Sequence, residues 1–155
     1  MIGWLLDTNV VAALIHPEGP RNVKKWAAAQ PESRLFLSIL TFGEYDKGLH
    51  NVPDDHPARP RYIAARDRLA ARFAGRILSL SDTVVRRWGV VSGTVKRLTG
   101  QAPPVIDTLL AATAVEHELY LATRNVKDVW NSGATVFNPW SDDPDSFPLS
   151  PAARR

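Results

Sequence analysis

The stretch IGWLLDTNV, residues 2–10, decides the fold, because it joins a short apolar run to polar residues and then to the start of a helix. Residues 2–6 do not alternate between apolar and polar side chains, which predicts a strand with both faces covered. Asp7, Thr8 and Asn9 follow at once, and short polar side chains of this kind cap helix N-termini. The stretch therefore predicts a buried strand that turns directly into a helix.

The same alternation of strand and helix continues along the chain. Apolar runs predict four more strands, at residues 35–37, 77–80, 119–123 and 135–137. Helical patterns lie between them, at residues 8–15, 21–30, 39–49, 62–73, 83–98 and 105–118, with a short helix at 125–129. Strands that alternate with helices predict a three-layer α/β/α domain with a mostly parallel sheet of about five strands.

Length and composition indicate one domain followed by a tail. The chain has 155 residues and is 45% apolar, which is enough to bury a core. We expect one domain over residues 1–140. Residues 141–155 are rich in Pro, Ser and Asp, and we expect a mobile C-terminal tail there.

Composition also excludes several classes of protein. The absence of cysteine excludes disulfides and thiolate metal sites. No apolar run approaches the roughly 20 residues that span a bilayer, so we expect no membrane association and a cytoplasmic location. The net charge of +3 is compatible with an anionic partner but does not establish one.

The predicted topology brings acidic residues to one edge of the sheet. In open parallel sheets, ligands bind beyond the carboxyl ends of the strands. Asp7 follows the first strand directly, and Asn125 and Asp128 follow the fourth. Asp107 lies in the first turn of the helix that runs back before the fourth strand, so it reaches the same edge. Glu44 lies in the helix after the second strand and can approach from one side.

Asp107 heads an apolar helix face, where a lone carboxylate would be costly. Its neighbours on that face are Leu110, Ala111, Ala114 and Val115. A divalent cation shared with Asp7 and Glu44 would compensate for the charge better than helix N–H groups alone. Carboxylate oxygens suit Mg²⁺ or Mn²⁺.

Each acid also has a simpler explanation. Asp7 can cap the first helix, Asp107 can interact with the helix dipole, and Glu44 can be a solvated surface acid. Asp46 is predicted to face solvent. What favours a functional site is the convergence of three acids on one predicted edge.

Five segments, in order, resemble the PIN-domain family. They are LLDTNVV (5–11), SILTFGE (38–44), PVIDTLLAATA (104–114), LATRNVKD (121–128) and FNPW (137–140). The similarity is closest to VapC toxins of the FitB-like branch. It implies a bacterial Mg²⁺-dependent ribonuclease that cleaves single-stranded or looped RNA. It also implies a homodimer and a cognate VapB-like antitoxin that covers the site.

The resemblance implies roles for individual residues. Asp7 and Asp107 would be the metal ligands, and Glu44 would complete the catalytic site. Supporting roles, through hydroxyl groups, would fall to Ser38, Thr8 and Thr41.

The segment after the fourth strand leaves the number of metal ions open. The family often has an acid where this chain has Asn125, and Asp128 can substitute for it. Arg124 and Lys127 lie beside the predicted site and are our best candidates for contacts with RNA.

Two alternatives follow from the same residues. The first is a catalytically weak PIN domain that binds nucleic acid or protein, which would explain Asn125. The second is a metal phosphohydrolase on another doubly wound fold. That class usually carries an Asp-x-Asp pair after the first strand, and Asn9 occupies the second position here.

Overall fold

A five-stranded parallel sheet forms the centre of the computed structural model, which describes residues 3–147. The strands are β1 (Trp4–Leu6), β2 (Leu35–Ser38), β3 (Ile77–Leu78), β4 (Tyr120–Ala122) and β5 (Val136–Phe137). Their order is β3-β2-β1-β4-β5, and every pair is parallel. The predicted sheet is confirmed. Ile2, the expected first strand residue, lies outside the described residues.

Seven α-helices connect the strands, and each had been expected. They are α1 (Thr8–Ile15), α2 (Arg21–Ala28), α3 (Ile39–His50), α4 (Arg59–Arg72), α5 (Asp82–Thr99), α6 (Val105–Glu116) and α7 (Val126–Val129). The start of α4 was predicted too late. Pro60 lies inside its first turn rather than in the loop, since proline is tolerated there. The 3₁₀ turns at Glu32–Arg34 and Pro144–Ser146 were not predicted.

Polar caps hold the strand-to-helix turns at the carboxyl edge of the sheet. The Asp7 side chain accepts a hydrogen bond from the Thr8 N–H and so caps α1. Ser38 caps α3 in the same way, through the Leu40 N–H. Both turns begin directly at the ends of central strands, so α1 and α3 start at the same edge.

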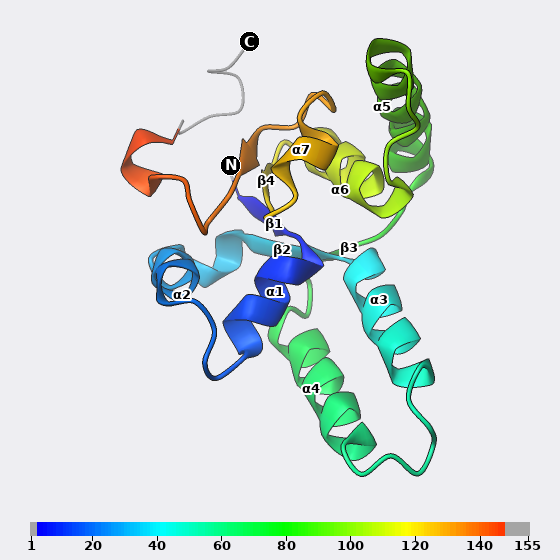
Figure 1. Cartoon of the computed structure of the whole chain (residues 1–155). Coiled ribbons are helices and arrows are strands. Elements are labelled where there is room, and N and C mark those ends of the chain that lie inside the picture. The colour runs from blue at the N-terminus through cyan, green and yellow to red at the C-terminus, as the bar shows by residue number, and fades with distance from the viewer. Residues whose placement is uncertain (1–2, 148–155) are drawn as a thin grey trace.

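Two hydrophobic cores lie on opposite faces of the sheet. The ribbon shows helices on both sides of the strands, as a three-layer fold requires (Figure 1). Side chains along β1 alternate between the two cores: Trp4 and Leu6 face one core, and Leu5 faces the other. Helices α1, α2 and α4 cover the first face, and α6 and α7 cover the second. The predicted α/β/α architecture is confirmed.

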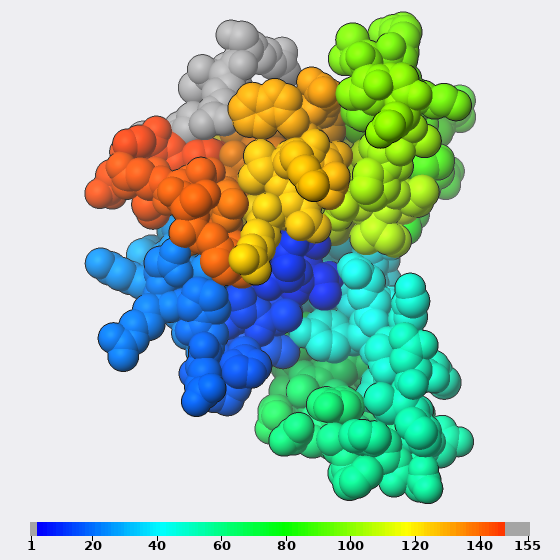
Figure 2. Space-filling view, viewed as in Figure 1, coloured from blue at the N-terminus to red at the C-terminus, as the bar shows by residue number. Residues whose placement is uncertain are grey.

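Helix α5 and the α3–α4 pair extend beyond these layers. Helix α5 packs along α6, where Trp88 Nε1 donates to Thr108 Oγ1 at 3.0 Å and Arg87 pairs with Glu116 at 2.6 Å. Helices α3 and α4 project from the body as a lobe, cyan and green in Figure 2. Across residues 3–147, the chain forms no helix long and apolar enough to cross a membrane.

The segment after residue 140 contacts the core through one aromatic side chain. The Phe147 ring centroid lies 4.9 Å from those of Tyr120 and Phe137, and 5.4 Å from that of Trp4. Residues 148–155 of the expected tail lie outside the described residues, so a tail beginning at residue 141 stays a prediction. Packing against the core extends at least to Phe147.

We expect Phe147→Ala to lower the free energy of unfolding by about 1–2 kcal/mol, because it removes a half-buried aromatic ring from this cluster. Urea denaturation measures the change. Phe147→Leu, which keeps apolar volume, should recover part of the loss. An unchanged urea midpoint in Phe147→Ala would show that the ring contributes nothing to the domain.

Candidate functional site

Asp7 is the most deeply buried acid of the predicted site, with only 5% of its surface exposed. Its Oδ1 accepts from the Thr8 N–H at 2.6 Å. Its Oδ2 accepts from Thr123 Oγ1 at 2.6 Å and from Asn9 Nδ2 at 3.2 Å. Asp7 therefore caps α1 and also lies at the carboxyl edge of the sheet. Its role as a helix cap is compatible with the predicted role as a site acid.

Burial raises the pKa of the Asp7 carboxyl above its usual range. The hydrogen bonds from Thr123, Thr8 and Asn9 oppose that rise, while the nearby charge of Glu44 adds to it. The donors offset part of the cost of a buried negative charge. A bound cation would offset more of it.

Glu44 reaches the edge from α3. Its Oε1 accepts from the Thr8 hydroxyl at 2.8 Å, and that hydroxyl lies 3.0 Å from the hydroxyl of Thr41, which is fully buried. The structure thus brings together three residues that the sequence had selected. Asp46, on the same helix, is exposed and pairs with Arg66 at 2.8 Å, as its predicted solvent-facing position allows.

Asp107 lies in the first turn of α6 and is half-buried. Burial is the main cause that raises its pKa to about 6, and the charges of Asp7, Asp128 and Glu44 raise it further. A hydrogen bond with Asn125 acts in the opposite direction. The four acids from separate segments are therefore close enough to affect one another electrostatically.

The donor chemistry fits a hard divalent cation, although the acids do not form a closed cage. Across residues 3–147, no three acidic, histidine or cysteine side chains gather closely enough to hold an ion by themselves. Mg²⁺ commonly binds through one or two carboxylates and completes its shell with waters and substrate phosphates. Asp7 and Asp107 would supply two such carboxylates. Asp7 accepts three hydrogen bonds within the protein, which leaves about one of its roughly four lone-pair positions for an ion.

Two residues that hold Asp7 had not been selected from the sequence. Thr123 is buried and donates to Asp7, and it also accepts from the Asn125 N–H at 3.0 Å. Asn9 Nδ2 contacts Asp7, and its Oδ1 accepts from the Arg124 N–H at 3.3 Å. Their position in the sequence could have indicated them, because both come just after the paired strands β1 and β4 and so lie at the same edge as Asp7.

The basic candidates lie at the surface of this edge. Arg124 and Lys127 are exposed, and the Arg124 guanidinium carbon lies 5.2 Å from the centroid of the Trp140 ring. Figure 2 shows the orange segment around residue 140 beside the gold segment that follows β4. Arg124 is thus held both at its backbone and at its guanidinium group.

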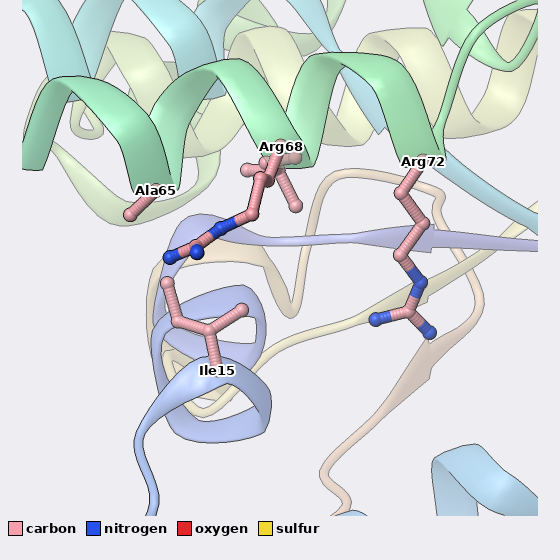
Figure 3. Close-up of a pocket in the computed structure, with 5 residues that line it drawn as sticks. Ile15, Ala65, Arg68 and Arg72 are labelled. Atoms are coloured by element: carbon pink, nitrogen blue, oxygen red, sulfur yellow. The ribbon is translucent and has the colours of Figure 1, made fainter.

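A separate small cleft lies between α1 and α4. It is lined by Ile15, Ala65, Arg68, Leu69 and Arg72 and has a volume of about 240 Å³ (Figure 3). Ile15 is the last residue of α1, whereas Asp7 caps its first turn. The cleft is therefore not part of the acidic site.

The parallel sheet and the acids at its carboxyl edge make this an α/β/α domain with an acidic site. Residues 4–127 match the PIN domain, and the chain belongs to that family. The resemblance identified from the sequence is confirmed. The alternative of a phosphohydrolase on another doubly wound fold is wrong, because the family fixes the fold.

Named relatives match nearly the whole chain. The chain is 28% identical to Toxin FitB of Neisseria gonorrhoeae over 138 residues, which cover 89% of this chain and 99% of the relative. It is 32% identical to VapC ribonuclease Y4jK of Sinorhizobium fredii over 140 residues, 88% of this chain and 96% of the relative. The crystal structure of FitAcB from Neisseria gonorrhoeae matches with a TM-score of 0.78 at 28% identity, covering 92% of this chain and 100% of that one.

We expect Asp107→Asn to stabilise the metal-free protein by about 1 kcal/mol at pH 7.5, allowing for solvent screening of a half-exposed side chain. The folded-state pKa of about 6 lies above the ordinary value of 3.8. The stability that protonated Asp107 provides is therefore present below about pH 4 and lost as the pH rises through 6.

Thermal unfolding in EDTA at several pH values measures this difference. The advantage of the Asn variant should be absent near pH 4 and reach its plateau above pH 7. An advantage that does not change with pH would contradict the electrostatic cause.

We expect Thr123→Val to lower the free energy of unfolding by about 1–3 kcal/mol at pH 7, because it removes a buried hydroxyl that donates to a carboxylate. Urea denaturation measures the loss. Thr123→Ser keeps the hydroxyl and should lose less. A Val variant as stable as the parent would show that this hydrogen bond has no net value.

Proposed function

We propose that this chain is a metal-dependent endoribonuclease and the toxin of a bacterial toxin–antitoxin system, cleaving single-stranded or looped RNA. The observation that carries the proposal is the convergence of acids from four separate segments, because the charges of Asp7, Asp128 and Glu44 all raise the pKa of Asp107. Such clustering is costly for a folded protein and is typical of sites that hold a cation. The relative named as a VapC ribonuclease supports the same chemistry.

In this proposal, Asp7 and Asp107 hold Mg²⁺, which Mn²⁺ can replace. When bound, the ion neutralises charge on the scissile phosphate and lowers the pKa of a water. The buried donors around Asp7 keep its carboxylate oriented for this purpose. Asn125 and Asp128 orient Asp107 or contribute to a second ion.

Glu44 is the group that orients the attacking water and accepts its proton. Its carboxylate is already held by the Thr8 hydroxyl, which in turn contacts Thr41. Water attacks phosphorus as its proton passes to Glu44, the P–O3′ bond breaks, and the departing O3′ takes a proton from solvent, so the products carry a 5′-phosphate and a 3′-hydroxyl. Thr8 and Thr41 do not react; they hold Glu44 in position.

Arg124 and Lys127 bind the RNA backbone beside these acids. Both are exposed and lie within five residues after β4, and Lys127 directly precedes Asp128. Cations at this position would offset the repulsion between the acidic cluster and the RNA phosphates.

A ribonuclease of this kind would damage its own cell unless it were kept inactive. We therefore propose that a cognate VapB-like antitoxin binds the chain in the bacterial cytoplasm and that the toxin forms a homodimer. The similarity to Toxin FitB supports the first part of this proposal. Co-purification with the protein encoded next to its gene would test it.

We expect Asp7→Asn and Asp107→Ala each to reduce cleavage of single-stranded RNA by about 100-fold or more, because each removes a carboxylate that stabilises the reacting centre. A fluorescent RNA and a Mg²⁺ titration measure the rate, and circular dichroism confirms that the variants fold. Asp46→Asn is the matched control, since it removes an acid that faces solvent on α3.

The alternative of a weak PIN domain predicts a different result. Such a module would bind RNA with the same affinity in EDTA and in Mg²⁺, and the parent protein would not cleave it. A fully active Asp7→Asn protein would remove the proposed mechanism.

A further inference from the structure

Arg124, one of the two basic residues at the acidic edge, forms no ion pair within residues 3–147. The ion pairs formed within residues 3–147 occupy arginines 59, 66, 72, 76 and 87, but not Arg124. Arg124 is exposed, and its N–H donates to Asn9, which also contacts Asp7. The backbone of Arg124 is thus anchored to a residue that contacts Asp7, and its guanidinium, which forms no ion pair within the described residues, is available to an anion from outside.

The guanidinium group of Arg124 is nevertheless restrained by an aromatic ring. It lies over the Trp140 ring, 5.2 Å from the centroid, a distance typical of a cation–π contact. Stacking uses the flat face of a guanidinium and leaves the N–H groups along its edges able to donate. Those edges match a phosphate group.

Trp140 is itself held firmly. Its backbone N–H donates to Asn138 Oδ1 at 3.0 Å, and its backbone carbonyl accepts from Asn22 Nδ2 of α2 at 2.7 Å. Its ring packs partly against the core on the α1–α2 face of the sheet. The hydrogen bonds fix the backbone of Trp140, and packing against the core restrains its ring, which therefore offers Arg124 a held surface.

We propose that Trp140 is a positioning residue for RNA binding, which holds Arg124 ready to engage a backbone phosphate of the substrate beside the acidic site. This inference rests on the proposed ribonuclease function. A flexible arginine loses side-chain entropy when it binds a phosphate, and an arginine already stacked on a rigid ring loses less. Trp140 therefore strengthens a contact that it does not make itself.

The test measures binding of a fluorescein-labelled single-stranded RNA by anisotropy, at several KCl concentrations, with Asp107→Asn present in every protein to prevent cleavage. Trp140→Leu should raise Kd about fivefold, and Trp140→Phe, which keeps an aromatic face, should stay within about twofold of the parent. Arg124→Ala should raise Kd by about five- to tenfold. It should also reduce the slope of log Kd against log[KCl] by about 0.7, the value for one phosphate contact on a single strand.

The double variant separates positioning from a simple loss of structure. If Trp140 acts through Arg124, Trp140→Leu should add nothing to Arg124→Ala. A purely structural Trp140 would lower the urea midpoint in Trp140→Leu but leave Kd and the salt slope unchanged, which would overturn the proposal. Arg34→Ala is the matched control, because Arg34 is an exposed arginine directly before β2, at the opposite edge of the sheet.

Three further outcomes separate a failure of this inference from a failure of the proposed function. If Trp140→Leu does not fold, Arg124→Lys carries the test. It keeps the charge but not the planar group, and it should raise Kd about threefold with unchanged stability. If the protein with native Asp107 cleaves the RNA while all variants bind it equally, only this inference fails. If the RNA is neither bound nor cleaved, the proposed function fails as well.

Discussion

The carboxylate of Asp7, buried at the end of the central strand β1, is the constraint on which the rest of the site depends. A charge at this depth is tolerated because three donors converge on it, from the Thr8 backbone and from the side chains of Asn9 and Thr123. Thr123 lies 116 residues away in the chain. The hydrogen bonds of Asp7 therefore fix how the segments after β1 and β4 lie against each other.

The parallel topology then places further charge around that carboxylate. Helix α6 runs back along the sheet, so its first turn brings Asp107 to the edge where β1 ends, and α3 brings Glu44. The raised pKa values of Asp7 and Asp107 express the cost of this arrangement. A fold selected only for stability would not gather these acids, whereas a site that binds a cation and a phosphate gains from them.

The same edge carries groups of opposite charge, and the acids and the basic side chain lie toward different sides of it. The acids lie at the end of β1, in the middle of α3 and in the first turn of α6, while Arg124 extends toward Trp140, which follows β5. An RNA strand bound by Arg124 would thus lie across the end of β4 and approach the acids from the β5 side. The cleft between α1 and α4 is separate from this path.

The strands, the helices and the acids are predictable from the sequence, because those signals are local. Unbroken apolar runs specify buried strands, polar caps specify helix starts, and the rule for parallel sheets places Asp7 and Asp107 at one edge. Which side chains meet at that edge depends on the folded structure. The Thr123–Asp7 bond, the Arg124–Trp140 stack and the packing of Phe147 depend on strand register and on rotamers. A linear pattern of residue types does not encode these contacts, because each joins segments that become neighbours only when the sheet closes.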